Sequence, residues 1–301
     1  MFLERLLKEF LLEVEIKNYT SMTIKSYKNN NLLFLNYLKT EFNLSEIEEL
    51  NKNHIKKYVQ YLTKRGHKPT YINSILKTIR TFLNYCMDEG YINSNPCLKV
   101  SWQKEGKVII NTFTDIEVQQ MMKVYNFTDY LNARNKCILA ILFDTGIRNW
   151  EVCCITNADI RPRSILIHGK GNKERVVPIS PYLRKVMLRY ESVKEMYLKN
   201  RIVKNDYYFI SYRQKQLTDE ATQRVVKIAG DKANVRKEIR VSPHTCRHYY
   251  AQAQLLNGLD CYSLSRLLGH ENLSITKRYL QSIKDEEILD LSIKSSPLIN
   301  L

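Results

Sequence analysis

The sequence SPHTCRHYYA, residues 242–251, predicts a helix that carries basic side chains near its start. Serine is a favoured N-cap and proline suits the first helical turn, so we expect the helix to begin just after Ser242. His244 and Arg247 are three residues apart and therefore lie on one face, close to the positive end of the helix. This arrangement favours an anion as ligand.

The segment LSRLLGH, residues 264–270, predicts a second helix nearer the C-terminus. Gly269 is typical of a helix end, which leaves His270 just beyond the last turn and free to point at a ligand. Tyr279 follows this segment. The chain has 20 tyrosines, and only its position in this series distinguishes Tyr279 from the others.

Composition narrows the class of partner. The 301 residues carry a formal net charge of +16, and the basic residues are spread along the chain, so a nucleic acid is the leading partner and a basic protein without such a partner is the alternative. Seven cysteines without a Cys-x-x-Cys pair indicate a reducing compartment. Charges within the first ten residues exclude a signal-peptide core, and no stretch is long enough to cross a membrane. We expect a cytoplasmic protein.

Residues 1–100 show apolar side chains at spacings of three and four, which predicts a bundle of helices. Pro96 ends this region, because proline cannot continue a helix. Residues 101–112 lack periodicity and are expected to form a linker. Basic residues of the bundle, the linker and the segment around residue 170 are predicted to contact DNA: Lys25, Lys28, Lys56, Lys57, Lys68, Lys77, Arg80, Lys104, Lys107, Lys170 and Arg175.

A second domain is expected over residues 113–284, followed by a tail over 285–301. Thr114 and Glu117 form a predicted capping box at its start. Helices dominate, but residues 164–168 and 175–179 have the pattern of two short strands around a glycine-rich turn. The predicted fold is mainly α with a small β-sheet, of the α+β class, in two domains.

Two more basic residues precede the C-terminal helices. Arg148 follows a helix break at Gly146, and Glu151 lies one turn on, where a carboxylate can orient a catalytic side chain or form an ordinary surface pair. Lys173 lies in the turn between the two predicted strands, from which a long amine can reach a minor groove or a leaving oxygen. Lys170 and Arg175 compete with Lys173 for this role.

These residue types suit phosphate chemistry. A tyrosine can attack a DNA phosphate only if the charge on the non-bridging oxygens is neutralised and the leaving 5′-oxygen receives a proton, and arginines, histidines and a lysine supply both. The rival interpretation is a zinc site, since His244 and His248 are one turn apart with Cys246 between them. Cys246 is expected on another face and no second ligand pair appears, so we predict no metal and a structural role for His248.

With these motifs, the chain resembles the tyrosine recombinase (phage integrase) family, most closely its short Xer-type members, over essentially its whole length. The resemblance implies a core-binding, SAM-like domain over 1–100 and a catalytic domain over 113–284 that close around DNA as a clamp. It also implies that the tail docks on a neighbouring protomer, although packing on its own domain is the alternative. The implied catalytic set is Arg148, Lys173, His244, Arg247, His270 and the nucleophile Tyr279.

The resemblance also implies a mechanism. Tyr279 would form a 3′-phosphotyrosyl link, with Arg148 and Arg247 holding the phosphate, Lys173 acting as general acid, His244 assisting proton transfer from Tyr279 and His270 donating a hydrogen bond to the phosphate. Glu151 would support the site. Because the link conserves the bond energy, no cofactor is expected.

The expected partners are double-stranded DNA with a specific recombination site, three further copies of the chain in a homotetramer on two sites, and an accessory recombinase or directionality factor. Integration or excision of a mobile element, transposition and Xer-like resolution all remain open. The alternatives are a DNA-relaxing enzyme of the type IB topoisomerase kind and a DNA-binding regulator that does not cut.

Overall fold

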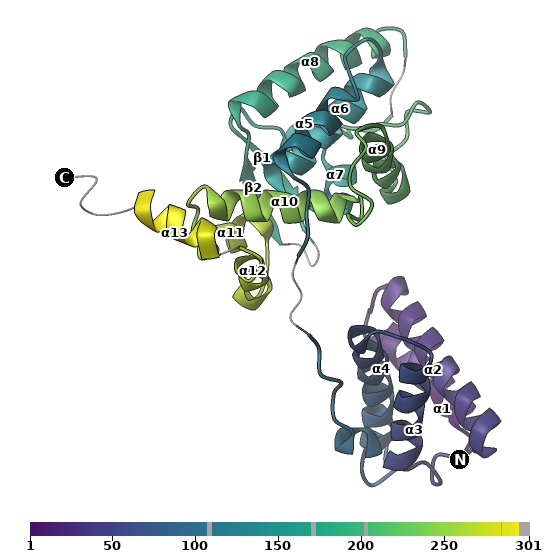
Figure 1. Ribbon diagram of the computed structural model, residues 1–301. Helices are drawn as coiled ribbons and strands as arrows, with labels where there is room; N and C mark the ends of the chain where they lie inside the picture. The colour runs from purple at the N-terminus through teal and green to yellow at the C-terminus, as the bar shows by residue number, and fades with distance from the viewer. Residues whose placement is uncertain (107–109, 170–172, 202–203, 284, 295–301) are drawn as a thin grey trace. The chain divides into compact units, whose positions relative to one another are not determined.

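The computed structural model describes residues 1–106, 110–169, 173–201, 204–283 and 285–294 (Figure 1). The predicted DNA contacts Lys107 and Lys170, part of the predicted linker and residues 295–301 of the predicted tail lie outside the described residues. The chain forms two compact units, Met1–Lys107 and Val108–Leu301.

The first unit is helical. Its apolar residues spaced at three and four form one core, in which Leu6, Phe34, Ile79 and Phe82 are fully buried. The helices begin at polar caps where the chain offers them; the Thr20 side chain, for example, accepts a hydrogen bond from the Thr23 amide. The elements of this unit are α1 (Leu3–Ile16), α2 (Ser21–Phe42), α3 (Lys52–Lys64), α4 (Pro69–Asp88) and the 3₁₀ helix η1 (Pro96–Lys99).

The second unit contains helices and one small sheet. Its elements are α5 (Asp115–Lys123), α6 (Tyr130–Thr145), α7 (Asn149–Cys154), η2 (Asn157–Asp159), β1 (Ser164–His168), β2 (Glu174–Pro178), α8 (Pro181–Leu198), α9 (Asp219–Lys232), α10 (Pro243–Leu256), α11 (Cys261–Leu268), α12 (Leu273–Leu280) and α13 (Asp285–Lys294). The strands pair antiparallel with Leu166 opposite Val176. The predicted fold class is confirmed, and the second strand begins one residue earlier than the sequence predicts.

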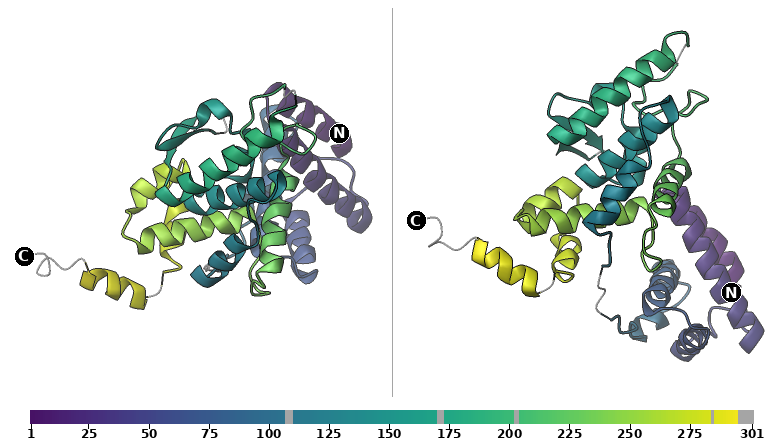
Figure 2. Two further views of the ribbon diagram at one scale, coloured as in Figure 1. Left: turned by 90° about the horizontal axis from the view of Figure 1, so that it is seen from above. Right: turned by 45° about the horizontal axis from the view of Figure 1, so that its top comes forward.

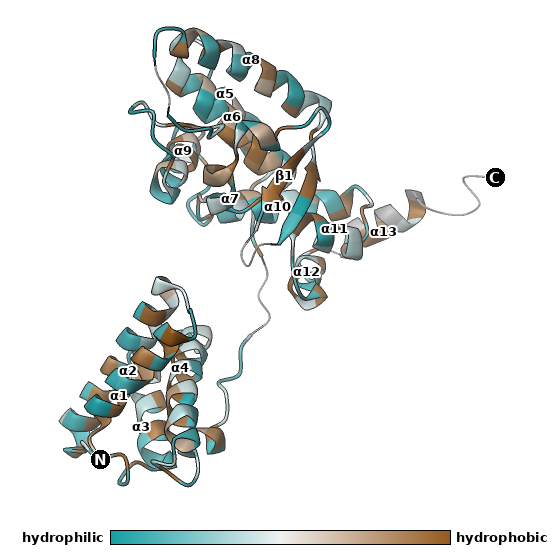
Figure 3. Cartoon of the chain, turned by 180° about the vertical axis from the view of Figure 1, so that it is seen from behind, coloured by the Kyte–Doolittle hydropathy of each residue, from teal (hydrophilic) through white to brown (hydrophobic). Residues whose placement is uncertain are grey.

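Helix α6 is the centre of the second unit. Its residues 137–142 are all buried, as expected of a helix that is apolar around its whole circumference. It packs against α8 and α10 (Figure 2), and both α6 and β1 are largely hydrophobic (Figure 3). This packing holds α7, which follows α6, against the sheet and α9.

The turn after α6 depends on a glycine. Gly146 has φ +60°, and a Cβ atom on it would lie 2.3 Å from the Tyr250 ring of α10. A side chain at this position would therefore suffer both backbone strain and a clash. The predicted helix end at Gly146 is confirmed, and the turn brings Arg148 to the start of α7.

The start of α5 is fixed by a buried carboxylate. Glu117 accepts a hydrogen bond from the Thr114 amide, and the Thr114 hydroxyl accepts one from the Glu117 amide, so the predicted capping box is present. The same carboxylate accepts hydrogen bonds from the backbone and side chain of Arg236. Burial would raise the pKa of Glu117, but the bonds from Arg236 and Thr114 outweigh it and lower the pKa to about 2.

Among the helices of the described chain, none is long and apolar enough to cross a membrane.

Candidate active site

A pocket of about 570 Å³ in the second unit brings together most of the side chains that the sequence selects. Arg148 caps the start of α7, His244 and Arg247 come from the first turns of α10, and His270 follows α11. Tyr279 comes from α12. The described lining comprises Ile110, Ile147, Arg148, Asn149, Trp150, Pro243, His244, Arg247, His248, His270, Ile275, Arg278 and Tyr279.

Three arginines converge on the C-terminal end of α11. The last carbonyl groups of a helix lack intrahelical partners and carry partial negative charge, so they attract cations. Here three successive carbonyl oxygens each accept a hydrogen bond from a different guanidinium: Leu267 from Arg175 (2.8 Å), Leu268 from Arg247 (2.8 Å) and Gly269 from Arg148 (3.0 Å).

Glu151 is the carboxylate that balances this charge. It is 3% exposed, pairs with both terminal nitrogens of Arg175, and accepts hydrogen bonds from Nη1 (3.0 Å) and the backbone amide (2.7 Å) of Arg148. Burial would raise the pKa of Glu151, but Arg175 and then Arg148 outweigh it, so the pKa is lowered. Glu151 therefore stays ionised and holds both arginines in place.

Arg247 lies deep in the pocket. Its Nη1 donates to the Gly146 carbonyl (2.8 Å) and its Nη2 lies 2.8 Å from Nε2 of His270. Burial, and then the charge of Arg148, lowers the pKa of Arg247 to about 10, which leaves it charged at neutral pH.

His270 is neutral at pH 7, because burial and the neighbouring charges of Arg247 and Arg148 lower its pKa to about 4. A guanidinium can only donate, so Nε2 of His270 accepts from Arg247. Its Nδ1 then carries the proton and donates to the Thr276 hydroxyl, 2.7 Å away. The sequence analysis did not select Thr276.

Tyr279 is 3% exposed and packs in a small apolar cluster with Tyr250, Leu264 and Leu268. Burial raises the pKa of its hydroxyl, and the charges of Arg247 and Arg148 oppose that shift without cancelling it. Tyr279 is therefore protonated at neutral pH.

The Tyr279 hydroxyl lies 3.2 Å from Nδ1 of His248. The sequence predicts a structural role for His248, and its position next to Arg247 and one turn after His244 is the only signal that could have marked it. The rings of His244 and His248 are in contact, with centroids 4.3 Å apart. Burial, and then Arg247, lowers the pKa of His244, whereas burial, and then His244, lowers the pKa of His248 to about 4.

Cys246 does not join these histidines. It is fully buried in the main core of the second unit, and burial raises the pKa of its thiol. Across the part of the chain that the structure describes, no group of three or more histidine, cysteine, aspartate or glutamate side chains could hold a metal ion.

Lys173 lies outside the pocket lining. It precedes β2, and its Nζ is 2.6 Å from Oε1 of Glu271, with both side chains mostly exposed. Arg175, predicted to contact DNA, has a side chain that is 11% exposed and is bonded to Glu151 and the Leu267 carbonyl. That prediction is revised, because a side chain with these partners holds the site together and does not face solvent.

Two sequence profiles match the chain. The profile described as "Phage integrase SAM-like domain" matches residues 3–101, and the one described as "Phage integrase family" matches residues 111–286. The chain belongs to the phage integrase family. It is a tyrosine recombinase, an enzyme that cleaves and rejoins DNA through a phosphotyrosine intermediate. The resemblance inferred from the motifs is thereby confirmed.

Relatives match this recombinase over most of its length. Tyrosine recombinase XerD of Listeria innocua serovar 6a is 27% identical over 270 residues, which cover 89% of this chain and 90% of that protein. Tyrosine recombinase XerC of Bacillus pumilus is 28% identical over 287 residues, covering 94% and 93%.

Solved structures share the fold. The recombinase XerH bound to a palindromic difH substrate, in a post-cleavage complex, has a TM-score of 0.76 at 18% identity and covers 96% of this chain and 84% of its own. A lambda integrase tetramer bound to a Holliday junction has a TM-score of 0.73 at 14% identity, covering 95% and 78%. The Tn1549 transposon integrase with transposon right end DNA has a TM-score of 0.71 at 15% identity, covering 98% and 99%.

Most of the predicted DNA-contacting lysines of the recombinase are exposed. Lys57 lies over the Phe42 ring. Arg80 is half-buried, donates to the carbonyls of Cys97 (3.2 Å) and Val100 (2.9 Å), and lies over the Trp102 ring. Arg80 therefore fastens the segment after η1 to α4, which leaves less of its side chain for DNA. The exposed lysines are Lys25, Lys28, Lys56, Lys57, Lys68, Lys77 and Lys104.

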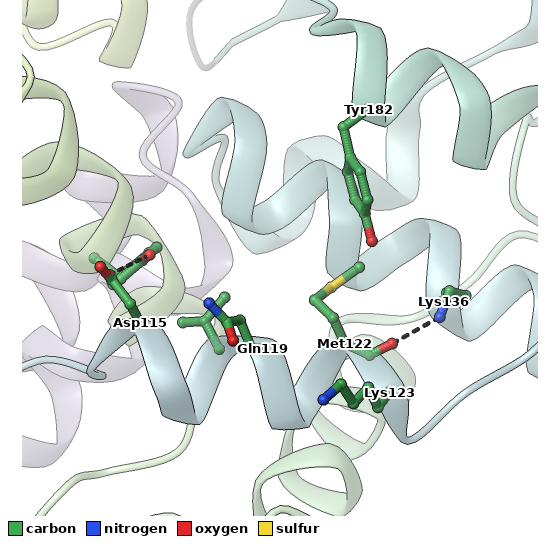
Figure 4. A pocket seen from close by; sticks show the side chains of 8 residues that line it. Asp115, Gln119, Met122, Lys123, Lys136 and Tyr182 are labelled. Carbon is green, nitrogen blue, oxygen red and sulfur yellow. Dashed lines mark hydrogen bonds between the residues drawn. The ribbon is translucent and has the colours of Figure 1, made fainter.

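Another pocket of the recombinase, of about 530 Å³, lies between α5, α6, α8 and α10 and contains none of the predicted site residues (Figure 4). Several of its polar groups have partners. Lys136 donates to the carbonyls of Met122 (2.7 Å) and Tyr125 (2.9 Å), and Asp115 accepts from the Tyr249 hydroxyl (2.8 Å). These bonds join α5 to α6 and α10, so we assign this pocket a structural role.

Proposed function

We propose that this recombinase carries out site-specific DNA recombination with Tyr279 as the nucleophile. The observation that carries the proposal is the pocket in which the Tyr279 hydroxyl lies with the guanidinium groups of Arg148 and Arg247. A tyrosine beside two fixed arginines suits attack on a phosphodiester, because charge grows on the non-bridging oxygens during attack.

The proposed cleavage step begins when Tyr279 Oη bonds to the scissile phosphorus. The bond from phosphorus to the 5′-oxygen breaks, which leaves a 3′-phosphotyrosyl link and, after protonation, a free 5′-hydroxyl. Arg148 and Arg247 bind the non-bridging oxygens, where charged donors contribute several kcal/mol. A second 5′-hydroxyl then attacks the link, so the bond energy is conserved and no cofactor is needed.

Lys173 is the proposed general acid for the 5′-oxygen. It pairs with Glu271, but both side chains are exposed, and an exposed ion pair contributes about 1 kcal/mol or less. DNA phosphates therefore compete readily for Lys173. Lys173 directly precedes β2 and its side chain is exposed, so the long amine is able to reach the DNA.

The remaining polar groups support the phosphate site. His270 contacts Arg247 and lines the pocket, and we assign it a hydrogen bond to the phosphate, for which its Nε2 must exchange the bond from Arg247 for a proton when DNA binds. His244 faces the same pocket at the start of α10 and assists the movement of the tyrosine proton. Glu151 accepts hydrogen bonds from Arg148 and Arg175 and so keeps both guanidinium groups in place.

The proposed DNA contacts of the first unit are its exposed lysines, with residues 1–100 as a core-binding domain and 113–284 as the catalytic domain of a clamp. Four copies would act on two DNA sites, and the likeness to a lambda integrase tetramer bound to a Holliday junction supports the number of copies. Helix α13 exposes Ile288, Leu289 and Ile293, which supports docking of the tail on a neighbouring copy. We also propose that accessory proteins take part and that the recombinase acts in the cytoplasm, at the bacterial nucleoid.

Two biological roles are proposed. The XerC and XerD relatives favour a resolution reaction, and the likeness to the Tn1549 transposon integrase favours integration, excision or transposition of a mobile element. Both roles use the same cleavage chemistry. The position of the gene beside mobile-element genes, or in a conserved chromosomal neighbourhood, separates them.

The test is covalent adduct formation on labelled, nicked duplexes from the ends of the genetic element that carries the gene. Wild-type protein is expected to give a band on a denaturing gel without divalent metal, and Tyr279→Phe none. Tyr250→Phe is the matched control, because the buried Tyr250 hydroxyl has no hydrogen-bond partner among the described residues. An adduct with Tyr279→Phe would overturn the proposal. Relaxation of DNA without site preference would favour the topoisomerase alternative, and salt-sensitive binding without cleavage at any tested site would favour a regulator.

A further inference from the structure

The histidine that contacts the proposed nucleophile is His248. Its Nδ1 lies 3.2 Å from the Tyr279 hydroxyl, and the two rings pack at a centroid distance of 5.5 Å. Because His248 belongs to α10 and Tyr279 to α12, this contact also joins the two helices next to the pocket.

The hydroxyl proton of Tyr279 has few acceptors to choose from. The described lining of the pocket holds no carboxylate, and arginines are donors only. The amide oxygen of Asn149 can accept a hydrogen bond but cannot hold a proton at neutral pH, which leaves three histidines. Nε2 of His270 accepts from Arg247 and its Nδ1 faces Thr276, so both nitrogens of His270 are engaged.

His244 and His248 remain as candidates. The described contact of His244 is with the ring of His248, whereas Nδ1 of His248 is within hydrogen-bond distance of the tyrosine oxygen. Arg247 also lies near this hydroxyl, and its positive charge lowers the pKa of Tyr279. Since Arg247 has no acceptor atom, the hydroxyl hydrogen is left to point at Nδ1 of His248.

We propose that His248 accepts the proton of Tyr279 in the cleavage step. This inference rests on the proposed function. As Oη bonds to phosphorus, its hydrogen moves to Nδ1 of His248, which becomes an imidazolium, while the 5′-oxygen leaves and takes a proton from the general acid. His244 then has an indirect role, since its ring packs against His248.

The pKa values of His248 and Tyr279 determine when the proton moves relative to attack on phosphorus. The pKa of His248, about 4, keeps the imidazole neutral at pH 7, so Nδ1 has a free lone pair. The pKa of Tyr279 is raised by burial, so transfer before attack would be strongly unfavourable. The proton must therefore leave while the bond to phosphorus forms, when Oη loses its basicity. A DNA phosphate nearby also raises the pKa of His248, because an opposite charge favours the imidazolium.

The experiment compares single-turnover cleavage by wild type, His248→Gln, His248→Ala and His244→Gln on the nicked duplex that gives the wild-type adduct. Each protein is tested with the normal 5′-oxygen and with a 5′-bridging sulfur, which leaves without protonation. We expect both His248 variants to be slower by about 10²- to 10³-fold on both substrates. His244→Gln should lose less, and Lys173→Gln should lose activity on the oxygen substrate only.

Glutamine separates proton transfer from positioning, because its carbonyl oxygen can accept the tyrosine hydrogen bond but cannot hold a proton at neutral pH. Added imidazole should restore part of the rate of His248→Ala, which a purely structural loss would not permit. DNA binding and thermal melting identify a variant that has failed to fold. If His248→Gln fails to fold, the imidazole response of His248→Ala decides; if His248→Ala fails to fold, the cleavage rate of His248→Gln decides.

Three results would overturn the assignment. His248→Gln could cleave at nearly the wild-type rate, or the His248 variants could recover their rate on the sulfur substrate. Alternatively, His244→Gln could lose more of its cleavage rate than the His248 variants do, on both substrates. A wild-type protein that forms no tyrosine adduct would overturn the proposed function itself, and this inference with it.

Discussion

Arg175 and Glu151 form a buried two-point ion pair, with Nη1 2.8 Å from Oε1 and Nη2 2.7 Å from Oε2. The pair joins β2 to α7, and the bond from Nε of Arg175 to the Leu267 carbonyl adds the end of α11. Through Glu151, the same contacts fix Arg148. A residue of the hairpin thus helps to position a proposed phosphate ligand.

Arg175→Met is expected to destabilise the second unit by about 3–5 kcal/mol, because it leaves the Glu151 carboxylate buried with one of its partners removed. The double variant Arg175→Met with Glu151→Gln should recover part of this loss. Urea unfolding followed by circular dichroism measures both. Lys173→Met is the matched control, since its exposed pair with Glu271 should contribute about 1 kcal/mol or less. Equal losses for the two single variants would contradict the assignment.

The lowered pKa of Glu117 predicts that the folded second unit loses stability in acid. Its pKa is about 2 in the folded chain and about 4.5 when unfolded, so its contribution is complete above about pH 5 and disappears as the pH falls towards 2. The full effect is about 3 kcal/mol. Urea midpoints from pH 6 to pH 3 should fall for wild type and fall less for Glu117→Gln. Glu238→Gln is the control, because Glu238 is exposed and lies 3.9 Å from the same Arg236; a wild-type slope in Glu117→Gln would refute the assignment.

The exposed lysines of α2 predict salt-dependent DNA binding. Lys25→Ala and Lys28→Ala should each weaken binding to DNA of every sequence. Each should also reduce the slope of log K against log salt by about 1, because the loss of one phosphate contact lowers the number of counterions that binding releases. Fluorescence anisotropy across salt concentrations measures this slope. Arg5→Ala offers a comparison, since Arg5 is exposed but pairs with Glu9 on α1. An unchanged slope in both lysine variants would remove α2 from the proposed DNA surface.

Gly146→Ala is expected to cost about 2–5 kcal/mol, the sum of backbone strain at positive φ and a clash with Tyr250. Gly258→Ala in the same unit meets nothing within 4 Å at φ +91° and should cost only the strain, about 1–2 kcal/mol. Thermal melting compares them. The Gly146 carbonyl also accepts from Arg247, so cleavage by Gly146→Ala should fall further than its stability implies. Similar melting of the two variants would show that the turn can move away from Tyr250.

Local patterns alone predicted most of the elements. Serine and proline at 242–243, the capping box at Thr114 and Glu117, and the glycines after α6 and α11 lie where the corresponding helices begin and end. Such signals depend on neighbouring residues, so they can be read along the chain. The order of the basic residues and Tyr279 likewise led to the correct family.

The contacts between distant residues could not be predicted in this way. Arg175 looked like a DNA-contacting residue and His248 like a structural one, because both assignments depend on what lies opposite each side chain. Folding places Arg175 against Glu151 and His248 against Tyr279, across sequence separations of 24 and 31 residues. No local pattern encodes such a pairing, since it arises only when α7, α10, α11, α12 and the two strands pack together in the folded unit.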